Sequence, residues 1–98
     1  MAIVGALSSG VTIAVAESVT IPKGSVLISG ASTAPSITVL DDNDFVFRTA
    51  PSDASQGVVL GNLANDEGYA TAGVLYINNA YGEGLANQFE QTLSLIHI

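Results

Sequence analysis

Residues 45–64, FVFRTAPSDASQGVVLGNLA, hold the clearest succession of a strand and a helix in the chain. Residues 45–49 alternate apolar and polar side chains as a strand does, and Pro51 ends that strand. Asp53 then opens a helix, because its carboxylate can cap free backbone N–H groups and Gln56 follows at the capping-box spacing. A strand that leads directly into a helix is the unit of an α/β fold.

The body of this helix carries an apolar stripe, which predicts the side that faces a core. The stripe consists of Val59, Leu60, Leu63 and Ala64. Gly68 suits the position just past the helix end, where a left-handed residue is common.

Towards the N-terminus, shorter patterns predict strands at residues 2–4 and 25–29 and a helical turn at 36–40. Residues 9–18 read as a helix with an N-cap at Ser8 or Ser9, although several β-branched residues lower its helix propensity. The side chains expected to share one face of this helix are Val11, Ala14, Val15 and Ser18.

Towards the C-terminus, residues 71–77 (TAGVLYI) form a nearly continuous apolar run, which is typical of a parallel strand covered on both faces. Residues 81–92 predict a last helix, with Leu85 and Phe89 four residues apart. The alternation of strands and helices predicts an α/β fold with a mostly parallel sheet.

The composition excludes several classes of protein. With 48% hydrophobic and only 11% charged residues, the chain is not intrinsically disordered. Lys23 and Arg48 are its only basic residues against nine acidic ones, so the net charge is -7. A nucleic-acid binder needs many Lys or Arg contacts to phosphates, and an anionic membrane would repel this chain. We therefore expect no nucleic-acid partner.

The sequence also lacks residue patterns that would bind a cofactor or a metal ion. The chain has no cysteine, and its one histidine, His97, stands next to the last residue. The acidic cluster at 41–44 lacks the spacing of a calcium loop and is interpreted as a solvated loop. Residues 5–10 (GALSSG) lack the lysine of a phosphate loop, and the dinucleotide pattern GxGxxG is absent. We expect no cofactor and no metal.

Small polar loops follow three of the predicted strands. They are Ser8-Ser9, Ala31-Ser32-Thr33 and Asn78-Asn79-Ala80-Tyr81. Ligands bind outside the carboxyl ends of strands in open α/β sheets, and hydroxyls with free backbone N–H groups suit a small carboxylate. The alternative is that these residues only cap helices and form turns.

Four segments, in order, resemble the type I periplasmic solute-binding proteins, and most closely the branched-chain amino acid group of ABC-transporter substrate-binding proteins. They are GALSSGVTIAVAESV, LISGASTAPSIT, FVFRTAPSDASQG and VLYINNAYGEGLANQFE. The resemblance implies a fragment of a two-lobe fold with parallel sheets flanked by helices. It places residues 1–51 in the first lobe, and a hinge crossing and the start of the second lobe in residues 52–92.

The resemblance also implies roles for individual residues. Ser9 resembles the hydroxyl that binds a ligand α-carboxylate, and the loop from Ala31 through Ser32 to Thr33 resembles the one that holds carboxylate and ammonium. Tyr81 resembles the aromatic residue that closes on the ligand from the second lobe. Asp53 stands where the family has an acidic residue beside the cleft, but helix capping explains it equally well.

The implied function is that of a periplasmic binding protein, with no signal peptide visible in this fragment. It would capture an amino acid, or a similar small carboxylate, in an interlobe cleft by a Venus-flytrap closure and deliver it to ABC permease subunits. One alternative is a sensory or receptor module of the same fold. An enzyme on a doubly wound sheet is disfavoured, because no general base is available.

Residues 93–98, LSLIHI, match the translation of a transposon-based sequencing adapter end. We expect them to be a non-native tail. The alternative is a helix that continues through Leu93 and Ile96.

Overall fold

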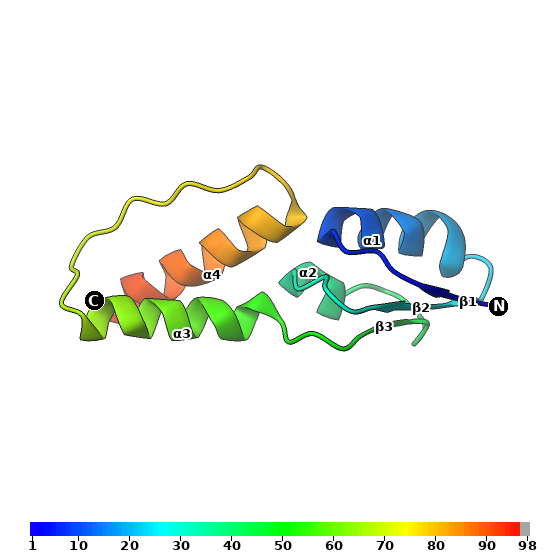
Figure 1. Ribbon diagram of the computed structural model, residues 1–98, viewed down its shortest axis with the longest axis horizontal. Coiled ribbons are helices and arrows are strands. Elements are labelled where there is room, and N and C mark those ends of the chain that lie inside the picture. Colours follow the sequence, from blue (N-terminus) through cyan, green and yellow to red (C-terminus); the bar gives the residue numbers. More distant parts are fainter. Residues whose placement is uncertain (97–98) are drawn as a thin grey trace.

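The computed structural model describes residues 1–96. Its elements are β1 (Ala2–Val4), α1 (Ser9–Val15), the π-helical turns η1 (Ala16–Thr20), β2 (Val26–Ser29), α2 (Pro35–Thr38), β3 (Val46–Arg48), α3 (Asp53–Asp66) and α4 (Ala80–Ile96). The molecule is elongated, with extents of 50 × 21 × 19 Å. Figure 1 shows two halves side by side: the sheet with α1 and α2, and the pair α3 and α4.

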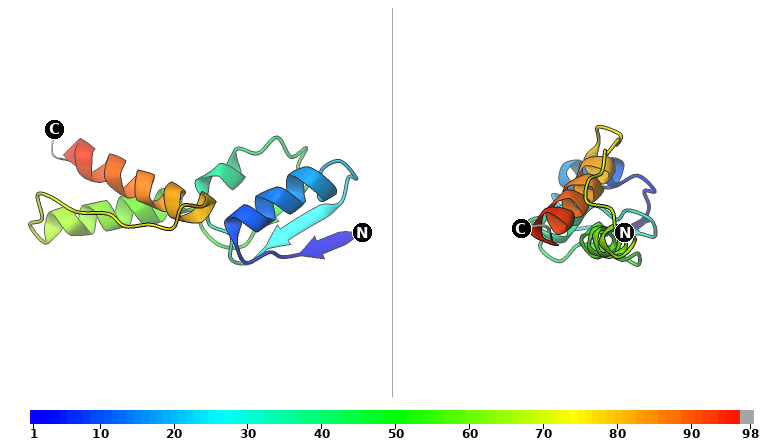
Figure 2. Two further views of the ribbon diagram at one scale, coloured as in Figure 1. Left: turned by 90° about the horizontal axis from the view of Figure 1, so that it is seen from above. Right: turned by 90° about the vertical axis from the view of Figure 1, so that its left-hand side faces the viewer.

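The three strands form one parallel sheet in the order β1-β2-β3, which confirms the α/β prediction. Ile3, Leu27 and Val46 lie opposite one another on the face that α1 covers, and Leu27 is completely buried there. Figure 2 shows α1 running alongside the strands, in the opposite direction. The carboxyl ends of all three strands therefore point towards the half that contains α3 and α4.

The other face of the sheet is largely uncovered in the described part of the chain. Val4, Ile28 and Phe47 form a row across it, and Val4 is 86% and Phe47 49% exposed. Helices thus flank the sheet on one face within residues 1–96.

The predicted helix at residues 9–18 is confirmed as α1 continued by η1, with Ser8 as its N-cap. The face that Val11, Ala14, Val15 and Ser18 share is not the buried face of this helix. The helix buries Ser9, Thr12, Ala16 and Thr20, whereas Val11 is 51% exposed. The reason is that the hydroxyl of Thr12 has hydrogen-bond partners in the loops after β1 and β2, so burial costs it little.

The predicted helix after Pro51 is confirmed as α3, and Gly68 ends it with a φ of 85°. The cap is Ser52 rather than Asp53, because the Ser52 hydroxyl accepts a hydrogen bond from the Ala54 N–H at 3.2 Å. The Asp53 carboxylate is engaged elsewhere, on Thr33.

Helix α3 packs on α4 through a glycine face. A Cβ atom at Gly61 would lie 2.6 Å from Thr92 Cγ2, and one at Gly57 would lie 3.0 Å from the backbone N of Phe89. Only glycine lets the two backbones come this close. The predicted apolar stripe of α3 therefore does not face a core, and Val59 is 64% and Leu63 51% exposed.

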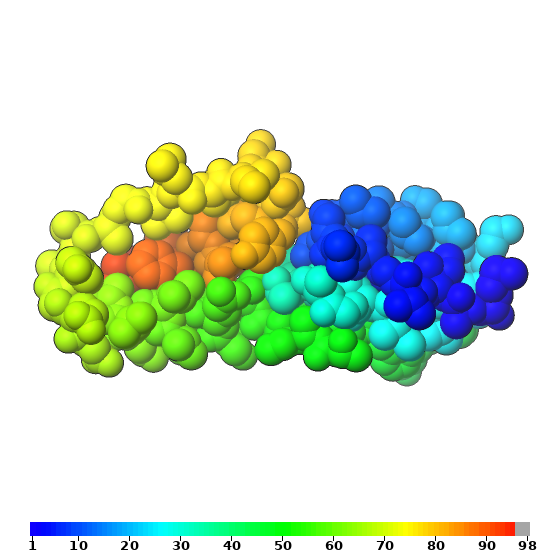
Figure 3. All heavy atoms as spheres, viewed as in Figure 1, coloured from blue at the N-terminus to red at the C-terminus, as the bar shows by residue number. Residues whose placement is uncertain are grey.

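The strand predicted at residues 71–77 is wrong: the segment is extended but pairs with no strand in the described part of the chain. Leu75 is fully exposed and Ile77 is 69% exposed. Figure 3 shows this yellow segment separated from the green atoms of α3, with the orange and red atoms of α4 between them. A strand requires a neighbour for its backbone hydrogen bonds, and within residues 1–96 no strand lies beside this segment.

The predicted last helix is confirmed as α4, which begins at Ala80 and continues past residue 92 to Ile96. Leu93 is buried, with 9% of its surface exposed. His97, in the expected non-native tail, lies outside the described residues. No helix in residues 1–96 has the length and apolar character needed to cross a membrane.

Candidate functional site

A hollow of about 430 Å³ lies where the sheet half meets the α3–α4 half. The loops after β1 and β2 form one side, and the start of α3 and the loop before α4 form the other. The residues that line it are Leu7, Ser8, Ser9, Ala31, Thr33, Gln56, Asn79 and Tyr81. This size is sufficient for a small organic ligand.

Ser9 and Thr33 face this hollow with defined hydrogen-bonding roles. The Ser9 hydroxyl is almost fully buried and accepts the Ala34 N–H at 3.2 Å, which leaves its own proton free to be donated. The Thr33 hydroxyl donates to Asp53 Oδ2 at 2.7 Å, which leaves its lone pairs free to accept. The two hydroxyls therefore offer opposite polarities to a ligand.

A buried network of hydroxyls supports the two sheet-side loops. The Thr12 and Ser32 hydroxyls lie 2.7 Å apart, and the Ser29 hydroxyl donates to the Ala6 carbonyl at 2.6 Å. The Ser32 hydroxyl also reaches that carbonyl, at 3.1 Å. Because Thr12, Ser29 and Ser32 are completely buried and hydrogen-bonded, they fix the loops after β1 and β2 against each other.

Arg48, at the end of β3, also holds the loop after β2. Its Nη1 donates to the Ala34 carbonyl at 2.7 Å and to the Ser32 carbonyl at 3.5 Å, and its Nη2 donates to the Thr38 hydroxyl. Hydrogen bonds from a charged donor are stronger than neutral ones, so this contact orders the loop after β2.

Asp53 lies behind Thr33 rather than in the wall of the hollow. Only 1% of its surface is exposed, and its N–H donates to the Thr33 carbonyl at 2.8 Å. Its Oδ1 is buried and has no hydrogen-bond partner within residues 1–96.

Tyr81 reaches the hollow from the first turn of α4, with 42% of its surface exposed. Asn79 fixes this turn, because its Oδ1 accepts the Gly82 N–H at 2.8 Å. One turn further on, a Cβ at Gly84 would lie 2.8 Å from Cδ of Pro35, so the two halves touch here.

The residues that line the hollow carry no charged side chain. They offer hydroxyls, two carboxamides and an aromatic ring, which suit a small neutral or zwitterionic molecule. They contain no nucleophile paired with a base.

The structure brings four of the predicted site residues together: Ser9, Ala31, Thr33 and Tyr81. It places the other two, Ser32 and Asp53, behind the lining residues, where each makes hydrogen bonds that support them. Leu7, Ser8, Gln56 and Asn79 were not among the predicted site residues. Ser8 and Asn79 belong to loops that the sequence singles out and could have been included, whereas nothing in the sequence marks Leu7.

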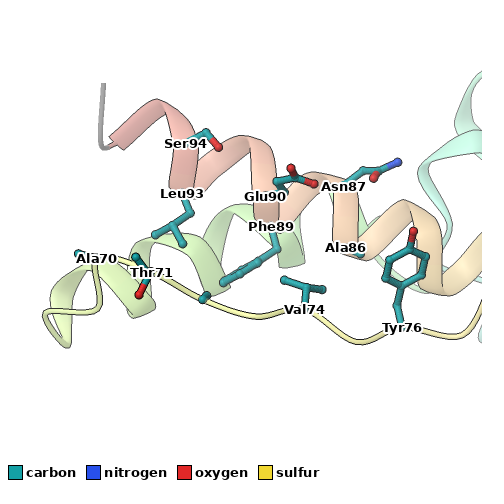
Figure 4. Close-up of a pocket in the computed structure, with 11 residues that line it drawn as sticks. Ala70, Thr71, Val74, Tyr76, Ala86, Asn87, Phe89, Glu90, Leu93 and Ser94 are labelled. Atoms are coloured by element: carbon teal, nitrogen blue, oxygen red, sulfur yellow. The ribbon is translucent and has the colours of Figure 1, made fainter.

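A larger hollow of about 540 Å³ lies elsewhere, between residues 70–76 and α4. Figure 4 shows Phe89 and Leu93 pointing from α4 towards this extended segment, with Val74 opposite them. None of the predicted site residues lines it. We interpret it as the space between α4 and this unpaired extended segment.

Comparisons with known proteins agree on one family. The model of the receptor family ligand binding region matches residues 1–98. The chain is 40% identical, over 93 residues, to the chemotactic signal transduction system substrate-binding protein BasB of Halobacterium salinarum.

Among solved structures, it resembles an ABC transporter substrate-binding protein from Desulfitobacterium hafniense, with 32% identity and a TM-score of 0.78 over 96% of this chain. A structure described as an ABC transporter substrate-binding protein from the same organism in complex with Leu gives 32% identity and a TM-score of 0.82 over 99% of this chain.

The chain spans only part of each relative. It covers 22% of the Halobacterium protein, and 27% and 28% of the two solved chains. The match to the Halobacterium protein covers 89% of this chain. The solved structures thus share the architecture of nearly all the described residues.

Proposed function

Because the chain belongs to the family of receptor ligand-binding regions, we propose that it is part of a solute-binding protein that serves an ABC transporter. The ligand is an amino acid of branched-chain type or a similar small carboxylate. The protein holds it between two lobes and presents it to the permease in the periplasm, and it releases the ligand chemically unchanged.

The observation that carries this proposal is the hollow shared by the two halves. Ser9 and Thr33 come from the sheet half and Tyr81 from α4. The free proton of Ser9 suits a carboxylate, the free lone pairs of Thr33 suit an ammonium group, and the ring of Tyr81 can cover an apolar side chain. A similar solved protein is described in complex with Leu, which supports this class of ligand.

The division into lobes is part of the proposal. We assign residues 1–51 to the first lobe, and the hinge crossing and the start of the second lobe to residues 52–92. The separate packing of the sheet half and the α3–α4 pair supports this division. Ligand contacts to both halves would favour the closed arrangement.

A sensory role is the second candidate, favoured by the similarity to a chemotactic substrate-binding protein. The same hollow would then capture the ligand, and a signal transducer instead of a permease would bind the closed form. The neighbouring genes separate the two roles: permease and ATPase genes support transport, and a transducer gene supports sensing.

Replacing Thr33 or Tyr81 with alanine is expected to weaken leucine binding by about tenfold each, the effect of one lost contact to a charged or apolar group. The reason is that each side chain faces the hollow from a different half. The measurement is isothermal titration calorimetry on the protein encoded by the complete reading frame.

Matched controls are Ser55→Ala and Tyr69→Ala, which remove the same kinds of group from exposed positions that do not line this hollow. Both controls should bind leucine as the wild type does. Unchanged affinity in Thr33→Ala and Tyr81→Ala together would refute the site.

We also propose that residues 93–98 are not part of the natural protein. The support is the match of LSLIHI to an adapter sequence. A long DNA read across codon 92 tests this. A frame that continues with other residues agrees with the proposal, and the same six codons in the genome contradict it.

A further inference from the structure

The carbonyl groups of the loop after β2 are held from the crossing between β3 and α3. Three consecutive carbonyls of this loop accept hydrogen bonds from that crossing. Arg48 donates to Ser32 O at 3.5 Å and to Ala34 O at 2.7 Å, and the Asp53 N–H donates to Thr33 O at 2.8 Å. With its carbonyls held in this way, the loop presents Ala31 and the Thr33 side chain to the hollow.

The Thr33 hydroxyl is fixed in the same manner. It donates its only proton to Asp53 Oδ2 at 2.7 Å, and Asp53 is 1% exposed, so water does not compete for that oxygen. An ionised carboxylate accepts hydrogen bonds and cannot donate them. The Thr33 oxygen can therefore act towards the hollow only as an acceptor.

We propose that Asp53 is a positioning residue that makes Thr33 an obligate hydrogen-bond acceptor, so that the hollow selects ligands carrying an ammonium group over isosteres that lack one. Asp53 does this without touching the ligand. The inference rests on the proposed function, since it names the residue that sets the ligand class of that same site.

Asp53→Asn removes this constraint, because an asparagine amide has a donor group as well as an acceptor. An asparagine amide can donate to the Thr33 oxygen, and the Thr33 proton then becomes free to point into the hollow. The oxygen that accepted from an ammonium group would now present a donor to it. The carboxylate contact, at Ser9, involves no atom of Asp53.

The test uses the protein encoded by the complete reading frame and two probes with the same side chain and carboxylate. These are leucine and its α-hydroxy acid counterpart, measured by calorimetry. In Asp53→Asn we expect leucine affinity to fall by about tenfold and hydroxy acid affinity to stay within about twofold, the cost of one charge-assisted hydrogen bond.

Two further variants sharpen the result. Thr33→Val should change the ratio of the two affinities in the same direction, and adding Asp53→Asn to it should change leucine binding no further, because both act through one hydroxyl. Asp66→Asn removes the same charge from the exposed end of α3 and should leave both affinities unchanged.

Three outcomes overturn the proposal. If Asp53→Asn lowers the affinity for leucine and for the hydroxy acid equally, the residue only stabilises the fold. An unchanged ratio in Asp53→Asn, with leucine still bound well, means that it does not set the polarity of Thr33. A wild-type protein that binds no amino acid removes the proposed function and this inference together, and the wild-type titration shows that result before any variant is made.

Discussion

Replacing Gly57 with alanine is expected to lower the free energy of unfolding by about 1–3 kcal/mol, the usual cost of overpacking a close contact. The added methyl group would meet the side chain of Gln88 and lie 3.0 Å from the backbone of both Gln88 and Phe89. Backbone atoms on α4 cannot rotate away as the end of a flexible side chain can. The two helices must therefore separate, and the contact at Gly61, one turn further, is weakened with them.

The direction in which Gly57→Ala changes the free energy of unfolding is what tests the packing of α3 on α4. Alanine is favoured over glycine within a helix by up to about 1 kcal/mol, so intrinsic propensity alone predicts a gain. Gly10 in α1 is the matched control, because a Cβ there has nothing within 4 Å. Gly10→Ala should be neutral or stabilising. Urea unfolding of the protein from the complete reading frame, followed by circular dichroism, measures both variants, and equal stability of the two would contradict the proposed packing.

The 98-residue chain, produced by itself, is expected to self-associate at micromolar concentration. Residues 71–77 contain no charged residue, are rich in apolar side chains, and pair with no strand in the described part of the chain. Unpaired backbone groups beside exposed apolar side chains form a template for strand pairing between molecules. Size-exclusion chromatography with light scattering, across a concentration series, measures the association.

Replacing Leu75 with lysine should reduce this association strongly, because the charge would sit at the fully exposed centre of the segment. Val39→Lys is the control: it places the same charge on an apolar residue that is 80% exposed but lies in the other half. If Val39→Lys is equally effective, net charge rather than the segment governs solubility, and the prediction is wrong.

Much of the fold follows from local signals. The short strands are apolar runs bounded by turn residues, and α3 is bounded by Pro51 and Gly68 as its sequence predicts. The features that local sequence patterns did not predict depend on contacts with residues that are far away in the sequence. The stripe of α3 points outwards because α4 requires the glycine face, and residues 71–77 do not form a strand because strand formation depends on a neighbour.

The same distinction explains the candidate site. Ser9, Ala31 and Thr33 lie on one side of the hollow because they follow β1 and β2, and the segments after parallel strands gather at one edge of the sheet. Tyr81 reaches the same hollow from the first turn of α4, in the other half. Asp53 was interpreted from its place in the sequence as a helix cap or a ligand contact. Its actual partner is Thr33, twenty residues earlier, and no local pattern marks that pair.

The contact between Gly84 and Pro35 has a thermodynamic consequence. It is a van der Waals contact between a backbone and a proline ring, and the described residues show no hydrogen bond across it. This contact can part without leaving polar groups unsatisfied. If the proposed closure occurs, a small free-energy bias would therefore redistribute the open and closed populations, tenfold for about 1.4 kcal/mol. A ligand bound between Ser9 and Tyr81 would supply such a bias. By reciprocity, any partner that prefers the closed halves would raise the affinity for that ligand by the same factor.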